Sequence, residues 1–341
     1  MSPKQQRWTR AVVGLAVAAV FVMLLARRVD WSEVRRVLSR AEWWPLVLAV
    51  VALGADMTAR ITRWCWMLRA AEPGLPLSSC VRPYLGSLAL NNTVPLRAGD
   101  VVRVFGFRTA LRAPAAHVAG TLVLERMLDL LVLLAILFVA LSGVSGGFPR
   151  AFVVIASFAG VAAIAALLSL TFFPQTIARL AQRLLSPFFS GRRWLPGVIR
   201  AIDQLTASLA LLRSPRLAAR LLALSVVAWL LEGSVFACVA WSLHIPVAWP
   251  APWLSLAAST LATLLPSSPG YVGTFDYFAT LGLRAYGSPA AGATAFALLT
   301  HLVLWLPVTV AGLLALLLSR GESSPSSLAH PRLESDSGLP A

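Results

Sequence analysis

Long apolar runs constrain this chain more than any other feature. Residues 151–173, AFVVIASFAGVAAIAALLSLTFF, contain no charged side chain and are long enough to cross the hydrocarbon core of a bilayer as a helix. In hydrocarbon, backbone N–H and C=O groups must be hydrogen-bonded within the segment, and a helix achieves this. We therefore predict an all-α polytopic membrane protein with about six full transmembrane helices, at residues 11–26, 43–66, 115–141, 151–173, 219–243 and 289–318.

The composition agrees with a membrane location and argues against a nucleic-acid partner. Apolar residues make up 58% of the 341-residue chain, and the mean hydropathy is +0.77. The formal net charge is +15, but the arginines flank apolar segments. This pattern is typical of cytoplasmic loops that face anionic lipid headgroups. We therefore expect contact with a membrane surface and no binding of nucleic acid.

The two ends of the chain differ from its apolar middle. Three basic residues precede the apolar run 11–26, but no small-residue cleavage site follows it, so we expect an uncleaved anchor. Residues 321–341 are rich in Ser and Pro and are predicted to form a disordered tail. Residues 1–320 are then a single transmembrane domain.

Two linkers are amphipathic. Residues 31–41 and 176–189 each place apolar side chains on one helical face and arginines on another. Such a helix lies in the headgroup plane or packs on its own protein, and the sequence leaves both readings open. The longer linker 174–218 carries seven arginines against Asp203 alone, so we expect it to be cytoplasmic.

Two further apolar regions, 81–112 and 252–286, are interrupted in the middle. Each consists of an apolar half-helix, a proline, three residues and then a glycine, in TVPLRAGD and LLPSSPGY. Backbone groups freed by such breaks cannot face lipid, so both breaks should lie inside the bundle and meet there. The residues of the breaks are Pro95 and Gly99 in the first region and Pro266, Pro269 and Gly270 in the second.

The order of these elements repeats along the chain, which predicts an internal duplication. Residues 11–141 and 151–318 each contain a span, an amphipathic linker, a span, a broken region and a further span. If the broken regions are re-entrant hairpins, each half crosses three times and the halves are inverted. If they cross fully, the N-terminus changes side. We favour the hairpins, because the charge of single loops does not decide between the two.

Six of the 14 acidic residues lie within or beside apolar segments. Ionised side chains are costly at membrane depth and are therefore functional candidates. A helix end at the headgroups is the alternative reading, and it suits Asp56 and Asp276 better than Glu232. The six residues are Asp56, Asp100, Glu125, Asp129, Glu232 and Asp276.

The segment LERMLDLL places two carboxylates on one helical face, because Glu125 and Asp129 are four residues apart. Two like charges there need a cation between them, and Arg126 points about 100° away from Glu125. A charge network could clamp the first broken region, or it could also handle a substrate or a proton, and the sequence leaves both open. The members that we predict for this buried network are Asp100, Glu125, Arg126, Asp129, Glu232 and Asp276. The expected partners of the two carboxylates are Arg97, Arg103 and Arg108.

The polar residues of the first break suit a lipid phosphate. Arg97 lies between Pro95 and Gly99, and its planar guanidinium can donate two parallel hydrogen bonds to a phosphate. Asp100 is a candidate N-cap of the half-helix that follows. The other residues that we assign to a headgroup site here are Asn91, Asn92, Arg103 and Arg108.

The second break offers hydroxyl and backbone N–H groups, and no cation follows until Arg284. The N-terminus of a half-helix favours an anion, a phosphate in particular, although a plain turn is the alternative reading. The candidate residues are Ser267, Ser268, Gly270 and Gly273.

No metal-binding or catalytic motif is recognisable. Three cysteines lack the spacing of metal ligands and are read as free or core thiols, and three histidines are isolated in the sequence. There is no nucleotide-binding loop and no nucleophile elbow. We therefore expect no metal, no cofactor and no catalytic residue. The cysteines and histidines concerned are Cys65, Cys80, Cys238, His117, His244 and His301.

Four stretches together resemble a known family. RITRWCWMLRA, SLALNNTVPLRAGDVVRVFGFR, TLVLERMLDLL and LLPSSPGYVGTFDYF resemble, in that order, signatures of the lysylphosphatidylglycerol synthase transmembrane region, also called the flippase-like domain family. The resemblance extends over about residues 11–320, and Asp276 stands where the family often has Glu. It implies a multi-pass protein of the bacterial inner membrane that moves an anionic phospholipid, or a lipid linked to polyprenyl phosphate, between leaflets.

The resemblance also bears on enzymatic activity. Large members of the family carry a cytoplasmic aminoacyl transferase domain, and we expect none here because the chain ends 21 residues after Arg320. Two alternatives stay open. SSPG is faintly similar to a loop of undecaprenyl-pyrophosphate phosphatases, which would indicate an integral-membrane lipid-phosphate enzyme. The chain would otherwise be a non-transporting partner of a membrane glycosyltransferase. The partners expected are a membrane lipid and a lipid-modifying enzyme or glycosyltransferase.

Overall fold

The computed structural model of the chain is all-helical over the residues that it describes, as the sequence predicts, and no strand occurs among them. These residues are 19–24, 30–94, 97–144, 150–173, 176, 179, 180, 183, 214–265 and 268–318. The helices are α2 (Trp31–Ser39), α3 (Trp43–Leu68), α4 (Leu77–Thr93), α5 (Ala98–Phe105), α6 (Arg108–Leu111), α7 (Ala115–Leu141), α8 (Arg150–Phe172), α11 (Pro215–Ser242), α12 (Pro250–Ala262), η3 (Pro269–Tyr271), α13 (Thr274–Arg284) and α14 (Ala290–Leu318).

Three of the described helices, α3, α11 and α14, are long and apolar enough to cross a membrane. Helices α7 and α8 form where two further spans are expected, and α7 carries three charged residues along its middle. The exact number of crossings stays a prediction. Several predictions fall largely or wholly on residues outside the described part of the chain: the span 11–26, the linker 174–218 with its helix 176–189, the tail 321–341, and Pro95, Pro266 and Ser267.

Local sequence signals set the start of two helices. The Asp30 carboxylate accepts a hydrogen bond from the backbone N–H of Ser32 at 2.9 Å and caps α2. Ser214 caps α11, and Pro215 occupies its first turn, where no backbone N–H is needed. Helix α2 buries Val34 and packs against α14, so the amphipathic stretch 31–41 packs on its own protein.

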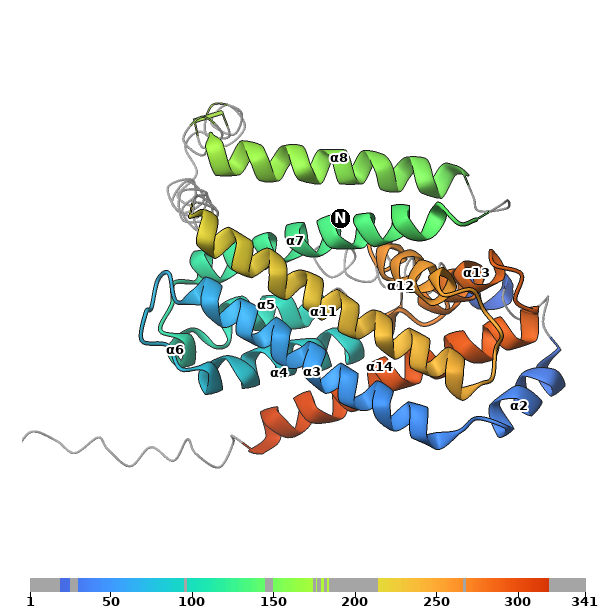
Figure 1. Cartoon of the computed structure of the whole chain (residues 1–341). Coiled ribbons are helices and arrows are strands. Elements are labelled where there is room, and N and C mark those ends of the chain that lie inside the picture. Colours follow the sequence, from blue (N-terminus) through green and yellow to red (C-terminus); the bar gives the residue numbers. More distant parts are fainter. Residues whose placement is uncertain are drawn as a thin grey trace, which may run out of the picture.

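The long helices lie side by side, with α3 along α11 and α14 along α4 (Figure 1). Helix α8 packs against α7 at the edge of the bundle. A large apolar core joins α7, α11, α12, α13 and α14, and it contains Phe236, Phe275 and Phe296. A second core, around Trp64 and Leu111, lies among α3, α4, α5 and α6. The polar residues discussed below lie on α3, α5, α7 and α11 and at the two breaks.

Each broken region consists of two helices packed against each other, α4 with α5 and α12 with α13. A glycine permits the close approach in both pairs. A Cβ atom on Gly99 of α5 would lie 1.8 Å from the carbonyl oxygen of Ser87 in α4. A Cβ atom on Gly282 of α13 would lie 2.6 Å from the Cα of Ser255 in α12. Larger residues at these positions would force the helices of each pair apart.

Replacing Gly99 with alanine should therefore destabilise the protein. The added methyl group meets a backbone oxygen that cannot rotate away, so we expect a loss of about 1–3 kcal/mol despite the better helix propensity of alanine. Thermal unfolding in detergent micelles measures the effect.

Gly54→Ala is the matched control, because no heavy atom lies within 4 Å of the new Cβ in α3. It should leave stability unchanged or raise it by up to about 1 kcal/mol. Equal melting temperatures for the two variants would contradict the close packing of α4 and α5.

Candidate functional site

Arg60, in the middle of α3, organises one end of a buried charge network. Its Nε atom lies 2.7 Å from Oδ1 of Asp56 on the same helix, and its Nη2 atom lies 2.6 Å from Oε2 of Glu232 on α11. Its Nη1 atom is 3.9 Å from Oδ2 of Asp129 on α7. Asp56 is fully buried in the interior of α3, so the reading of this residue as a helix end is wrong.

Arg63, one turn further along α3, continues the network towards α5. Its Nη1 atom is 2.7 Å from Oδ1 of Asp129 and donates to the Ser225 hydroxyl at 2.6 Å. Its Nη2 atom lies 3.9 Å from Oε1 of Glu125, whose Oε2 atom is 3.0 Å from Nη2 of Arg103. Carboxylates and guanidinium groups therefore alternate, and a cation separates the two carboxylates on the face of α7.

Aromatic rings enclose both ends of the network. The Arg103 guanidinium lies 3.7 Å from the ring centroid of Trp64 and 4.2 Å from that of Tyr84. At the other end, the Arg60 guanidinium lies 4.3 Å from the ring centroid of Trp229. These cation–π contacts fix the guanidinium groups within the bundle.

The network is richer in acids than in bases. Four carboxylates face three guanidinium groups among the described residues, so the cluster is net negative when every group is ionised. Arg103 is 1% exposed and paired with Glu125. It therefore does not offer a free positive charge to a headgroup in this structure.

Sequence reasoning did not identify Arg60 and Arg63 as members of this network. The signal was present in ADMTARITRW, where Asp56, Arg60 and Arg63 are spaced for one helical face within an otherwise apolar run. The prediction that Arg126 belongs to this buried network is wrong, because 46% of its side chain is exposed and its Nη2 atom lies 4.0 Å from Asp100, outside the network.

The first break is held by the side chain of Asn91. Its Nδ2 atom donates to Oδ1 of Asp100 at 2.9 Å, and its Oδ1 atom accepts from the backbone N–H of Asp100 at 3.3 Å. The amide thus satisfies one of the free N–H groups at the start of α5. The N-cap position belongs to Arg97, so the prediction that Asp100 is the N-cap is wrong. The neighbouring Asn92 donates to the Thr309 hydroxyl of α14 at 2.8 Å.

The second break is strained. Gly270, Tyr271 and Gly273 have φ angles of 67°, 60° and 85°, and the left-handed region is unfavourable for a tyrosine. The Asp276 carboxylate accepts the backbone N–H of Gly273 at 2.8 Å. Asp276 lies in the first turn of α13, so it is at a helix end, and its side chain is buried there. The expectation that the Gly273 N–H is open to an anion is wrong in this structure.

Arg97 connects the two breaks. Its Nε atom donates to the Tyr271 hydroxyl at 3.0 Å, and its Nη2 atom donates to the carbonyl oxygen of Thr263 at 3.1 Å. A Cβ atom on Gly270 would lie 3.3 Å from the carbonyl oxygen of Asn92, so the two backbones also approach each other. Both hydrogen-bond partners of Arg97 are neutral groups. Among the described residues, no carboxylate forms an ion pair with its guanidinium.

The remaining candidate residues contribute less to this contact. Arg108 is exposed on α6. The Ser268 hydroxyl donates to the carbonyl oxygen of Val272 at 3.1 Å within its own turn. His301, isolated in the sequence, lies between the second break and α13, with its ring nitrogens 2.8 Å from Oδ1 of Asp276 and 2.9 Å from the carbonyl oxygen of Gly270.

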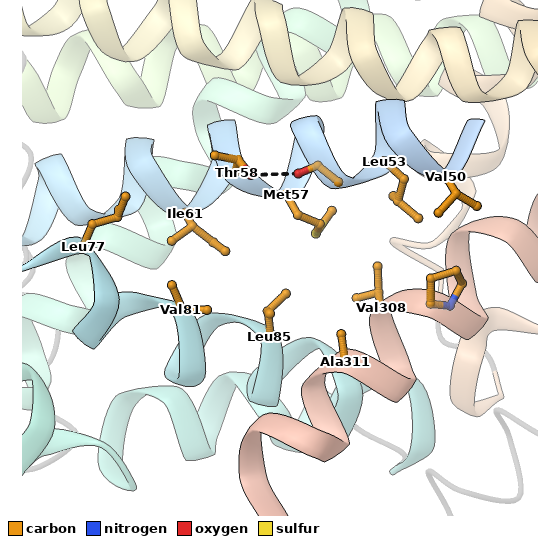
Figure 2. Close-up of a pocket in the computed structure, with 12 residues that line it drawn as sticks. Val50, Leu53, Met57, Thr58, Ile61, Leu77, Val81, Leu85, Val308 and Ala311 are labelled. Carbon is orange, nitrogen blue, oxygen red and sulfur yellow. Dashed lines mark hydrogen bonds between the residues drawn. The ribbon is translucent and has the colours of Figure 1, made fainter. Parts of the chain in front are cut away.

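An apolar groove of about 370 Å³ runs between α3, α4 and α14 (Figure 2). The side chains of Met57 and Ile61 face those of Val81 and Leu85 across it. The Thr58 hydroxyl donates to the carbonyl oxygen of Gly54 at 2.8 Å and so presents no free donor to the groove. Asp56 and Arg60 of the charge network lie on the same helix, α3. The groove fits a hydrocarbon chain and no polar ligand.

Comparison with known proteins identifies the family. The family model described as the lysylphosphatidylglycerol synthase TM region matches residues 11–312. The chain belongs to this family. Membership supports a membrane protein with a lipid-related function, and the match extends over both broken regions and the whole charge network.

A curated relative from Haloferax volcanii, glycosyltransferase AglD, is 25% identical to the chain over 332 residues. The alignment covers 88% of this chain and 53% of the relative, so the chain spans about half the length of that protein. The similarity is therefore to part of AglD.

The ion pairs of the network predict that replacing Asp129 destabilises the protein. Asp129→Asn removes the negative charge that faces both Arg60 and Arg63. We expect a loss of about 1.5–3 kcal/mol, because Arg63 loses its one carboxylate at hydrogen-bond distance and keeps only Glu125, 3.9 Å away. Thermal unfolding of the purified protein measures this loss.

Arg126→Gln is the control for the Asp129 variant, because its side chain is half-exposed and its nearest recorded carboxylate is 4.0 Å away. It should cost less than about 1 kcal/mol. A parent-like melting temperature for Asp129→Asn would show that the network is not formed.

Proposed function

We propose that this protein moves an anionic phospholipid, or a lipid linked to polyprenyl phosphate, between the leaflets of the membrane. We place it as a multi-pass protein of the plasma membrane, with both broken regions as re-entrant hairpins and the two halves as inverted repeats. The family match supports a lipid-related function, and the site residues give that function a specific form.

The observation that carries the proposal is the position of Arg97. It lies where the two breaks meet, its recorded partners are a hydroxyl and a carbonyl group, and no acid among them neutralises its charge. A phosphate is the ligand best matched to a guanidinium of this kind, because two parallel hydrogen bonds add to the charge attraction. We therefore assign the headgroup phosphate to Arg97, with Asn92 and Ser268 beside it.

In our proposal the charge network holds the helices together and also takes part in lipid movement. Several of its buried atoms have no hydrogen-bond partner among the described residues, namely Asp56 Oδ2, Arg63 Nε and Nη2, Arg103 Nε and Asp129 Oδ2. Two of these atoms lie near a second charged group, since Asp129 Oδ2 is 3.9 Å from Nη1 of Arg60 and Arg63 Nη2 is 3.9 Å from Oε1 of Glu125. Spare donors and acceptors allow the network to change partners when a polar headgroup passes, while the apolar groove between α3, α4 and α14 holds a hydrocarbon tail.

The similarity to AglD favours a second candidate function. The relative is a glycosyltransferase, and this chain resembles about half of it. The alternative is therefore a membrane partner of a glycosyltransferase that positions a lipid without moving it. Lipid movement in vesicles that contain this protein alone separates the two candidates, because a non-transporting partner would give none.

Arg97→Lys tests the phosphate assignment. The variant keeps the positive charge but loses the planar pair of donors, so we expect translocation to fall by about tenfold, the effect of one charge-assisted hydrogen bond. The probe is fluorescent phosphatidylglycerol in vesicles of phosphatidylcholine and phosphatidylglycerol, with dithionite reporting the outer-leaflet fraction.

Arg108→Lys is the matched control, since Arg108 is exposed on the short helix α6. It should translocate the probe at the parent rate. Normal translocation by a folded Arg97→Lys protein would overturn the phosphate role, and no translocation by the parent protein would overturn the proposed function.

A further inference from the structure

We propose that His301 and Asp276 form a proton-binding site that holds the second break closed against α14, so that release of the proton opens the headgroup path. This inference rests on the proposed function, because a headgroup path exists only if the protein moves a lipid. The proton site itself rests on the geometry of one imidazole ring between two elements.

Both nitrogen atoms of the His301 ring face acceptors. Nε2 lies 2.9 Å from the backbone carbonyl oxygen of Gly270, which can only accept a hydrogen bond, so Nε2 carries a hydrogen. Nδ1 lies 2.8 Å from Oδ1 of Asp276. A hydrogen must lie between these two atoms as well, on the ring or on the carboxyl group. The pair therefore holds one proton more than a neutral histidine beside an ionised aspartate.

Loss of that proton breaks one of the two contacts. When Nδ1 gives its proton to water, its lone pair faces the Asp276 carboxylate, and two acceptors repel each other at hydrogen-bond distance. If the remaining hydrogen moves to Nδ1, the Nε2 lone pair faces the Gly270 carbonyl oxygen instead. Either way, the bridge from α14 to the second break is complete only in the protonated form.

The bridge secures the most strained part of the second break. Gly270 is the residue whose carbonyl group His301 holds, and it is followed by Tyr271, which also has a positive φ angle. A non-glycine residue stays in this conformation only when its surroundings impose it. The hydroxyl group of Tyr271 in turn accepts the hydrogen bond from Arg97. Proton release at His301 is therefore linked, through one neighbouring residue, to the contact between the two breaks.

Among the described residues, Asp276 is the charged partner of His301. From α13, the Phe275 ring lies 4.9 Å from the imidazole centroid, and Asp276 makes the ion pair. Arg97 is the charged group on the far side of Tyr271. Helices α2, α3, α4 and α11 also pack on α14, and among the described residues none of their charged groups forms an ion pair with His301. The His301 side chain is 15% exposed.

Hydrogen exchange of the protein in lipid nanodiscs tests the site without any assay of transport. We compare backbone protection of residues 268–273, corrected for the intrinsic pH dependence of exchange, at about pH 5.5 and 8, which spans the range in which imidazole groups titrate. The parent protein should lose about tenfold in protection at the higher pH, the effect of losing one charge-assisted hydrogen bond.

Asp276→Asn removes the need for the proton while it keeps every contact. The new amide can donate to a neutral Nδ1 atom, its oxygen can accept the Gly273 N–H, and Nε2–H can still reach the Gly270 carbonyl oxygen. Protection should therefore be high and equal at both pH values. His301→Gln, which also cannot titrate in this range, should likewise show no pH dependence and covers the case in which the first variant does not fold.

His244→Gln is the control, because His244 pairs with Glu42 at 3.0 Å on the exposed surface and away from both breaks. It should keep the tenfold loss of the parent protein. Equal protection of the parent at both pH values, or a parent-like loss in Asp276→Asn, would overturn the proton site. Translocation of fluorescent phosphatidylglycerol is measured on the same preparations. Its absence at every pH would count against the proposed function and would leave the result at His301 standing.

Discussion

An ionised side chain inside an apolar bundle must have a partner of opposite charge, and the rest of this structure depends on that requirement. Arg60 and Arg63 of α3 lie between carboxylates of α7 and α11, and Arg103 connects α5 to Glu125. Dispersion forces alone would let these helices slide, whereas the ion pairs fix their register. The first broken region is thereby tied to the centre of the bundle.

The same requirement explains why the two breaks contact each other. Proline and glycine release backbone groups that hydrocarbon cannot satisfy, and here Asn91, Asp276 and His301 take up several of them. Arg97 then lies between the two breaks with neutral partners. An anionic headgroup would supply the missing negative charge, and the groove along α3 would accommodate its tail. In this account the same charged and polar residues hold the broken regions in place and bind the lipid.

Much of the fold follows from the sequence alone. Long apolar runs predict the helices, and the paired Pro and Gly residues predict two broken regions, which the structure shows as helix pairs in contact with each other. The contacts of Arg63 and His301 could not be predicted, because their partners lie 66 and 25 residues away and nothing local indicates them. The same limit applies to Asp100, whose backbone N–H donates to the side chain of Asn91, while Arg97 occupies the N-cap position.

The central claim is that the charge network serves lipid movement and not stability alone. Arg63→Met combined with Asp129→Leu tests it most directly, because apolar residues of similar size can replace a buried ion pair without loss of stability. The account predicts a double variant that melts near the parent temperature in detergent and translocates fluorescent phosphatidylglycerol at least about tenfold more slowly. Parent-like translocation by the folded double variant would contradict it.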